Sequence, residues 1–159
     1  MNKRAIIKKI IARLADEFSA FCRAAEASRA EATHEQSKAE SKYDTRGLEA
    51  SYLARGQSRQ VQELETAIAE FEKLPPRSFA PGEPIDLGAL VELETNGESY
   101  IYFIGPRAGG TEVEHLKQEV LVITPQSPLG SQLLGKKQGD RLQLALAGAQ
   151  NQYHVRSVS

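Results

Sequence analysis

The chain has 159 residues and a formal net charge of −1, and 26% of its residues are charged. That length allows one ordinary domain, or one small domain with an extended element. The near-neutral charge excludes a global basic field, so any contact with nucleic acid has to be local or made through a partner.

A single cysteine, Cys22, excludes a disulfide framework and indicates a reducing compartment. No apolar run approaches the roughly 18 residues of a membrane span, and lysines interrupt the apolar start too early for a signal peptide. We therefore expect a soluble, cytoplasmic protein.

Glycine and proline divide the chain into two halves of different composition. Neither residue occurs within 1–46, and only two glycines precede Pro75, whereas both residues recur every few positions afterwards. The change predicts a helical part over residues 1–74, a linker over 75–84 and a second domain over 85–159.

The helical part carries a heptad pattern with opposite gradients in its two arms. The first arm changes from bulky to small side chains at Ile7, Ile11, Leu14, Phe18, Phe21, Ala25, Ser28 and Ala32. The second arm changes from small to bulky at Ala50, Ala54, Gln57, Val61, Leu64, Ile68 and Phe71. Because the bulky ends meet only if the arms run in opposite directions, we predict an antiparallel coiled-coil hairpin. Each arm of about 30 residues would extend on the order of 45 Å, with the turn falling within residues 33–46.

The second half has the alternating apolar pattern of β-strands. We predict strands over residues 89–94, 100–104, 120–124, 141–146 and 152–157, and a short helix near 131–134. The first two strands are joined by Thr95-Asn96-Gly97-Glu98, a strong hairpin signal. These elements predict an antiparallel sheet, and the chain as a whole is predicted to be of the α+β class.

One stretch combines several residues with defined backbone roles. We expect Ser127 to cap the short helix and Pro128 to occupy its first position. Gly135 suits a left-handed helix end, and Gly139-Asp140 suits a tight turn before the next strand. These roles predict a strand–helix–turn–strand unit, in which Leu133 and Leu134 pack the helix on the sheet.

The same stretch resembles the C-terminal signature of the GreA/GreB transcript cleavage factors. The resemblance lies in Ser127-Pro128-Leu129-Gly130, Leu133-Leu134-Gly135-Lys136-Lys137 and Gly139-Asp140, and also in Tyr102-Phe103-Ile104-Gly105-Pro106. The order of parts, with a helical hairpin before a small β-rich domain, also agrees over nearly the whole chain. The family resemblance implies an FKBP-like C-terminal domain docked at the RNA polymerase secondary channel, with the hairpin inserted down that channel.

The hairpin tip departs from the family's acidic string. An ungapped alignment puts Glu40 at the family's Asp position and Tyr43 at its Glu position, with Asp44 one residue further on. Glu40 and Asp44 would share one helix face and offer hard oxygen ligands to Mg²⁺. The resemblance implies that these two carboxylates are the catalytic and metal-binding residues, holding a magnesium ion shared with the polymerase and not bound tightly by this chain alone. A gapped alignment on Glu49-Ala50-Ser51-Tyr52 would break the heptad phase.

Two further groups of residues are candidates for contacts in the same complex. Lys38, Lys42 and Arg46 are placed to steer the RNA 3′ end by charge, although such residues equally suit a solvated helix surface. Leu129, Leu133 and Leu134 are candidates for a polymerase-docking patch, with a core role as the alternative for at least two of them. The three histidines have no zinc-ligand spacing.

The resemblance implies a monomeric transcription elongation factor that is not itself an enzyme. It would bind RNA polymerase and stimulate the polymerase's own cleavage of backtracked RNA, touching the RNA 3′ end indirectly and DNA only within that complex. The main alternative is a channel-binding regulator that does not stimulate cleavage. A prolyl isomerase or chaperone is a third alternative, suggested by the fold analogy alone.

Overall fold

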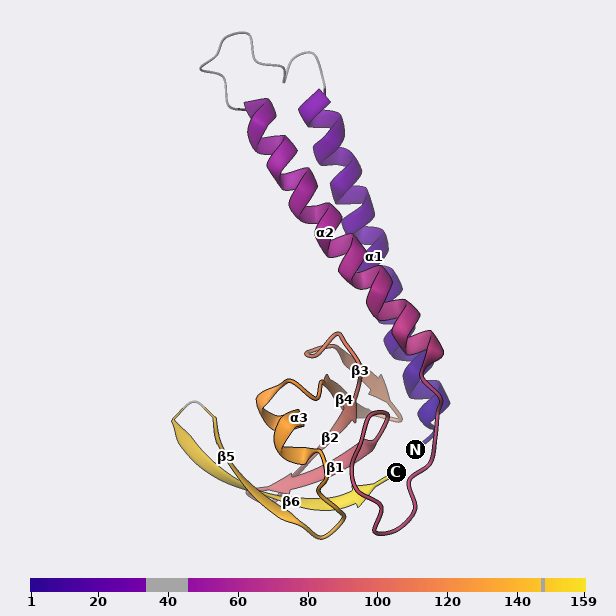
Figure 1. Cartoon of the computed structure of the whole chain (residues 1–159), viewed down its shortest axis with the longest axis vertical. Helices are drawn as coiled ribbons and strands as arrows, with labels where there is room; N and C mark the ends of the chain where they lie inside the picture. The colour runs from indigo at the N-terminus through magenta and orange to yellow at the C-terminus, as the bar shows by residue number, and fades with distance from the viewer. Residues whose placement is uncertain (34–45, 147) are drawn as a thin grey trace. The chain divides into compact units, whose positions relative to one another are not determined.

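The computed structural model describes residues 1–33, 46–146 and 148–159, and within these ranges the side chains of residues 25, 28, 29, 31–33, 46–58 and 146 are not described. Two long helices come first, α1 (Lys3–Thr33) and α2 (Arg46–Lys73) (Figure 1). The remaining elements are β1 (Leu90–Thr95), β2 (Glu98–Ile104), β3 (Glu112–His115), β4 (Gln118–Ile123), α3 (Pro128–Leu133), β5 (Arg141–Leu146) and β6 (Ala149–Val158). This order confirms the predicted α+β class, with two helices followed by a small sheet domain that contains one short helix.

The described chain forms two compact units that divide both long helices. One unit is Leu14–Ala69, and the other joins Met1–Arg13 to Glu70–Ser159. The predicted boundaries assigned residues 1–74 to the hairpin, whereas here the beginning of α1 and the end of α2 belong with the sheet. We call the second unit the β unit.

Within the unit Leu14–Ala69, α1 and α2 run in opposite directions (Figure 1). Leu14 keeps 1% of its surface exposed and Ala67 keeps 4%. An isolated helix cannot bury a leucine to that extent, so these positions pack against a neighbouring element. The small ends of the predicted seam lie outside the described side chains.

The sheet has six strands in the order β3-β4-β2-β1-β6-β5. All neighbouring strands are antiparallel except β2 and β4, which are parallel with Ile101 opposite Val120. The sheet is therefore mostly antiparallel, as predicted, with one parallel pair that the sequence did not indicate. The cause of this pair is β3, a four-residue strand missed in the sequence, which forms a hairpin with β4 and leaves the other edge of β4 for β2.

The predicted turn between the first two strands is confirmed. Asn96 and Gly97 both have positive φ, at 51° and 78°. Two consecutive left-handed residues form the type I′ turn that matches the twist of paired strands. This turn sets the register in which Val91 faces Tyr102 and Leu93 faces Tyr100.

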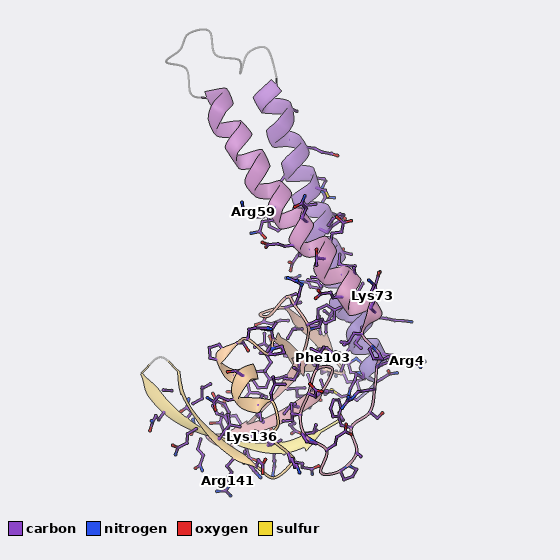
Figure 2. All side chains as sticks on the ribbon, in the orientation of Figure 1. Arg4, Arg59, Lys73, Phe103, Lys136 and Arg141 are labelled. Atoms are coloured by element: carbon purple, nitrogen blue, oxygen red, sulfur yellow. The ribbon has the colours of Figure 1, made fainter. Side chains whose placement is uncertain are left out.

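The sheet is covered on both faces, and the alternation of side chains assigns each residue to one face. The face under α3 carries the main hydrophobic core: Phe79, Ile85, Ala89, Val91, Leu93, Ile104, Ile123, Leu129, Leu133, Leu142, Tyr153 and Val155. Phe103 lies on the opposite face because its neighbour Ile104 belongs to this core, and it has no exposed surface (Figure 2). Both faces of β2 are therefore buried where Phe103 and Ile104 end the strand, whereas its first residues are exposed.

Candidate functional site

The predicted carboxylates of the hairpin tip lie outside the described residues. Glu40, Asp44, Lys38 and Lys42 fall within 34–45, and Arg46 begins α2 with a side chain that is not described. The catalytic, metal-binding and RNA-steering roles of these residues therefore stay predictions. Among the described residues, no group of three or more His, Cys, Asp or Glu side chains is arranged to hold a metal ion.

The described candidate site is the signature loop, which we define as residues 124–140. At its start, the Oγ of Ser127 accepts a hydrogen bond from the Gly130 backbone N–H at 3.0 Å and donates one to the Thr124 carbonyl at 2.7 Å. Pro128 follows as the first residue of α3. This geometry confirms the predicted N-cap and explains the Ser-Pro pair, because the cap satisfies a backbone donor that the helix leaves free.

Gly130 is required by the space around it. A Cβ at this position would lie 1.9 Å from the Thr124 carbonyl oxygen and 2.7 Å from Ser127 Oγ. The loop folds back so tightly on itself that no larger residue fits without moving the backbone. The glycine in Ser-Pro-Leu-Gly is therefore part of the cap.

The second half of the signature loop is held by backbone hydrogen bonds. Gly135 has a φ of +83°, and its N–H donates to the Ile85 carbonyl at 2.9 Å. Gly139 has a φ of +92° and donates to the Val155 carbonyl at 2.8 Å. Asp140 accepts from the Lys137 N–H at 2.8 Å, which closes the turn. The predicted left-handed helix end and tight turn are both confirmed.

The three leucines proposed for docking are mainly core residues. Leu133 has no exposed surface and Leu129 keeps 9%, and both belong to the main core. Leu134 is partly buried and packs against that core. The predicted packing of α3 on the sheet is confirmed, whereas a docking role stays a prediction for which Leu134 is the most accessible of the three.

The end of α2 packs on the opposite face of the sheet. The rings of Phe71 and Phe103 lie 6.2 Å apart, and Phe71 has no exposed surface. A Cβ on Gly105 would lie 2.7 Å from Phe71 Cζ and 2.9 Å from a methyl group of Val122. The glycine of Tyr-Phe-Ile-Gly-Pro therefore leaves the space into which the Phe71 ring fits.

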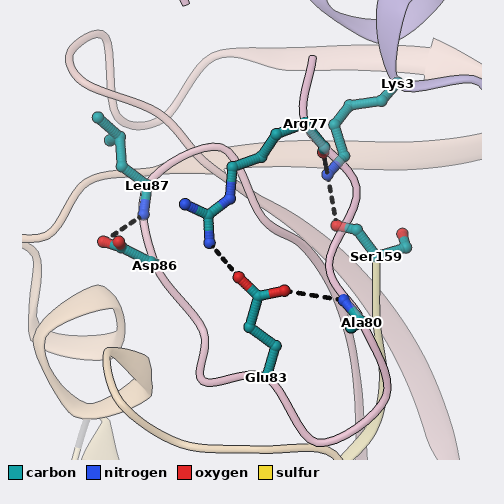
Figure 3. Close-up of polar contacts among 7 residues, drawn as sticks. All are labelled: Lys3, Arg77, Ala80, Glu83, Asp86, Leu87 and Ser159. Atoms are coloured by element: carbon teal, nitrogen blue, oxygen red, sulfur yellow. Dashed lines mark hydrogen bonds and ion pairs between the residues drawn. The ribbon is translucent and has the colours of Figure 1, made fainter. Parts of the chain in front are cut away.

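The beginning of α1 is fastened to the β unit by two lysines. Lys3 Nζ donates to the backbone oxygens of Arg77 at 2.6 Å and Ser159 at 2.5 Å (Figure 3). Lys9 Nζ donates to the Glu114 carbonyl at 2.6 Å. These bonds link the first turns of α1 to the loop after α2, to the end of β6 and to β3.

Lys3 is an unusual lysine because only 9% of its surface is exposed. Its ammonium group lies 4.8 Å from the centre of the Phe79 ring, and the Arg77 guanidinium lies 4.2 Å from the same centre. Burial, together with the nearby charge of Arg77, lowers the pKa of Lys3 to about 8. The Arg77 side chain is itself paired with Glu83 at 2.5 Å (Figure 3).

The importance of these residues was not visible in the sequence. In the sequence, Lys3 is one of several basic residues near the start and has no distinguishing feature. Ile6 and Ile10 have no exposed surface, yet they lie outside the predicted heptad seam. Ile11, which is in the seam, is only partly buried. One signal was available in the sequence. The first turns of α1 contain more isoleucines than a single heptad seam can bury, which indicates a second packed face.

The architecture of this chain is that of a helical hairpin followed by a small β domain with a capped short helix. Solved structures with similar architecture are GreA factor homolog 1 (Gfh1) of Thermus thermophilus, at 23% identity and a TM-score of 0.40 over 94% of both chains, and Gfh1 of Thermus aquaticus, at 24% identity and a TM-score of 0.41 over 95% of this chain and 94% of that one. The GreA/GreB elongation factor of Nitrosomonas europaea is similar at 19% identity and a TM-score of 0.39, over 60% of this chain and 78% of that one.

At these identities the similarity concerns the fold and assigns no role to any residue. No family model matches the chain, and no curated protein sequence matches it significantly. In the part of the chain that the structure describes, neither long helix is apolar enough to cross a membrane.

Proposed function

We propose that this chain is an accessory factor of RNA polymerase that acts through the secondary channel and stimulates cleavage of backtracked RNA. The observation that carries the proposal is the signature loop, whose sequence resembles that of the GreA/GreB factors. Its serine, proline and glycines have the backbone roles expected of them, with Gly130 required by a 1.9 Å approach to the Thr124 carbonyl. The two antiparallel helices α1 and α2 would supply the element that such a factor inserts.

In this proposal the hairpin tip contributes negative charge and the polymerase contributes the rest of the reactive centre. Glu40 and Asp44 would offer two oxygen ligands to a magnesium ion, too few to hold it without the polymerase. The bound ion would supply an activated water for hydrolysis of the RNA. Lys38, Lys42 and Arg46 would hold the RNA 3′ end near these carboxylates by charge.

A second candidate function is regulation from the same channel without cleavage. It is favoured by the tip sequence, in which Tyr43 occupies the position of the family's Glu and Asp44 lies one residue further on. A carboxylate displaced by one helical residue points in a different direction, by about 100° around the axis. Such a factor would still enter the channel but would not position a metal ligand.

One assay separates the two functions. Backtracked elongation complexes with 5′-labelled RNA are incubated with the wild type or with the Glu40→Ala/Asp44→Ala variant, and RNA length and polymerase binding are both measured. Cleavage stimulation predicts that the wild type shortens the RNA and that the variant binds but shortens it at least about 100-fold more slowly, since loss of a metal-linked contact commonly costs this much.

The matched control is Glu65→Ala/Glu72→Ala, which removes the same charge from exposed positions of α2. It should shorten the RNA like the wild type. Wild-type binding without RNA shortening would establish the regulator instead, and absence of polymerase binding would reject both functions.

A further inference from the structure

An open hollow lies over strands β2, β3 and β4, and just over half of its lining residues share the sheet face of the main core. Its volume is about 500 Å³, and its lining residues are Glu92, Ser99, Tyr100, Ile101, Tyr102, Glu112, Gln118, Glu119 and Leu121. Tyr102 and Leu121 pack against the main core and form the floor. Tyr100 stands beside them on β2 with 41% of its surface exposed. The floor of the hollow is therefore apolar and aromatic.

The rim of the hollow is acidic. Strand register puts Glu114 directly opposite Glu119 on the β3–β4 hairpin, with Glu112 on the neighbouring diagonal. Like charges in this arrangement repel each other and destabilise the hairpin. A hydrogen bond with Glu112 and the negative charge of that residue raise the pKa of Glu119. A cation bound between these carboxylates would relieve their repulsion.

The charge of the hollow is not balanced from within. On the face that Tyr100 and Tyr102 occupy, its lining includes Glu112 and Glu119, and none of its lining residues is a lysine or arginine. The hydroxyl of Tyr100 donates to Glu98 at 2.5 Å, which adds a further carboxylate beside the exposed ring. A chain with a net charge of −1 overall therefore concentrates negative charge at one aromatic surface.

The chemistry of this surface favours an organic cation over a metal ion. Among the described residues no three acidic or histidine side chains converge as metal ligands. Tyrosine rings attract arginine and lysine heads, and an apolar floor suits their hydrocarbon stems. An open hollow on a sheet face also admits a peptide chain more readily than it encloses a small molecule.

We propose that this hollow binds a basic segment of a partner protein, with an arginine or lysine side chain lying over Tyr100 and Tyr102 and its charge between Glu112 and Glu119. The site lies entirely within the β unit. It depends on the fold and not on the proposed role at RNA polymerase, so either can fail without the other.

The test uses the full chain and a labelled peptide of sequence Gly-Arg-Leu-Arg-Gly, capped at both ends. A second peptide carries citrulline, which has nearly the shape of arginine without its charge, at both arginine positions. Binding is measured by fluorescence anisotropy, and its location by backbone amide shifts in an isotope-labelled protein. We expect the arginine peptide to shift amides on β2, β3 and β4, and the citrulline peptide to bind at least tenfold more weakly.

Variants of the protein test which of its residues the arginine peptide requires for binding. Glu112→Gln/Glu119→Gln should weaken the arginine peptide about tenfold, and Tyr100→Leu about threefold, while the matched Glu65→Gln/Glu72→Gln control should stay within twofold of the wild type. Equal weakening by the two double variants would overturn the proposal, because it would show only attraction to net charge. Equal binding of the citrulline peptide, or displacement by magnesium chloride beyond that by sodium chloride of equal ionic strength, would also overturn it.

Discussion

At the scale of single residues, two glycines are required for space and not for backbone freedom. Gly105 accommodates the Phe71 ring, and Gly130 accommodates the Thr124 carbonyl. Neither has a positive φ, unlike Gly135 and Gly139. Both belong to the strings that resemble the GreA/GreB family, so those strings record close contacts within the β unit. Such a motif is therefore direct evidence about the fold of the β unit. It bears on function only through the resemblance to the family.

Gly130→Ala should lower the free energy of unfolding by at least about 2 kcal/mol, because the added methyl group overlaps the Thr124 carbonyl. Gly109→Ala is the matched control, since its Cβ would meet its nearest atom, in Thr124, at an ordinary 3.4 Å. The control should cost less than about 1 kcal/mol. Urea unfolding of both variants measures the difference, and equal costs would contradict the role given to Gly130.

Lys3 should make stability depend on pH in the mildly alkaline range. Its pKa is lowered from 10.5 to about 8 in the folded chain, so between these values the unfolded chain binds more protons. Stability should therefore rise with pH as folded Lys3 loses its proton, by about 1 kcal/mol from pH 7.5 to 9.5 after allowing for solvent screening.

The Lys3→Met variant provides the baseline for this prediction. It loses the two hydrogen bonds to Arg77 and Ser159 at every pH, but it cannot contribute a lysine titration. Urea unfolding at several pH values should give a steeper rise for the wild type than for the variant. Parallel profiles would show that the Lys3 ammonium is stabilised as well in the fold as in water.

At the scale of elements, the ends of the two long helices are structural parts of the sheet domain. Phe71 packs against Phe103, Glu70 pairs with Arg107 at 2.9 Å, and Lys9 bonds to Glu114. The ion pair is exposed and contributes little, so the apolar contact provides most of the stabilisation. The first turns of α1 and the last turn of α2 are thus packed parts of the β unit.

Phe71→Ala should reduce the free energy of unfolding by about 3–5 kcal/mol, because it leaves a cavity beside Phe103 and Gly105. Phe18→Ala, at a partly buried position of α1, should cost about half as much or less. Thermal or urea unfolding measures both. A cost for Phe71→Ala no larger than that for Phe18→Ala would contradict the placement of Phe71 in the core of the β unit.

At the scale of the whole molecule, the division into units predicts which part folds alone. A chain in which a flexible linker of about 12 residues replaces Leu14–Ala69 keeps the β unit complete. It should unfold cooperatively. The fragment 75–159 loses both helix ends and uncovers Phe103, Val120 and Val122, which have no exposed surface in the chain. That fragment should unfold at lower urea and bind a hydrophobic dye.

The same deletion also tests whether polymerase docking and RNA cleavage belong to different parts of the chain. If the β unit docks on the polymerase and the hairpin tip acts on the RNA, the shortened chain should bind polymerase without shortening backtracked RNA. Competition with the full chain measures the first property, and labelled RNA the second. Loss of all polymerase binding by a folded β unit would assign docking to the hairpin.

Much of the fold followed from local patterns. The opposite gradients of the two heptad seams predicted the hairpin, and the alternation of apolar residues predicted all strands except β3, whose Glu-Val-Glu-His sequence buries only Val113 and His115. Ser127, Gly135 and Gly139 predicted their own conformations. For the strands, the cap and the turns, the structural cause lies within a few residues of the residue concerned, whereas for the hairpin it lies in the repeat along each arm.

Only the tertiary structure decided which faces of these helices and strands pack against each other. The first turns of α1 bury Ile6 and Ile10 as well as Ile7, β4 pairs in parallel with β2, and Tyr100 meets Glu112 and Glu119 around one hollow. Each of these results depends on which faces of distant segments come together. A period of 3.5 or 2 residues states that a face is apolar, but it does not state what will cover that face.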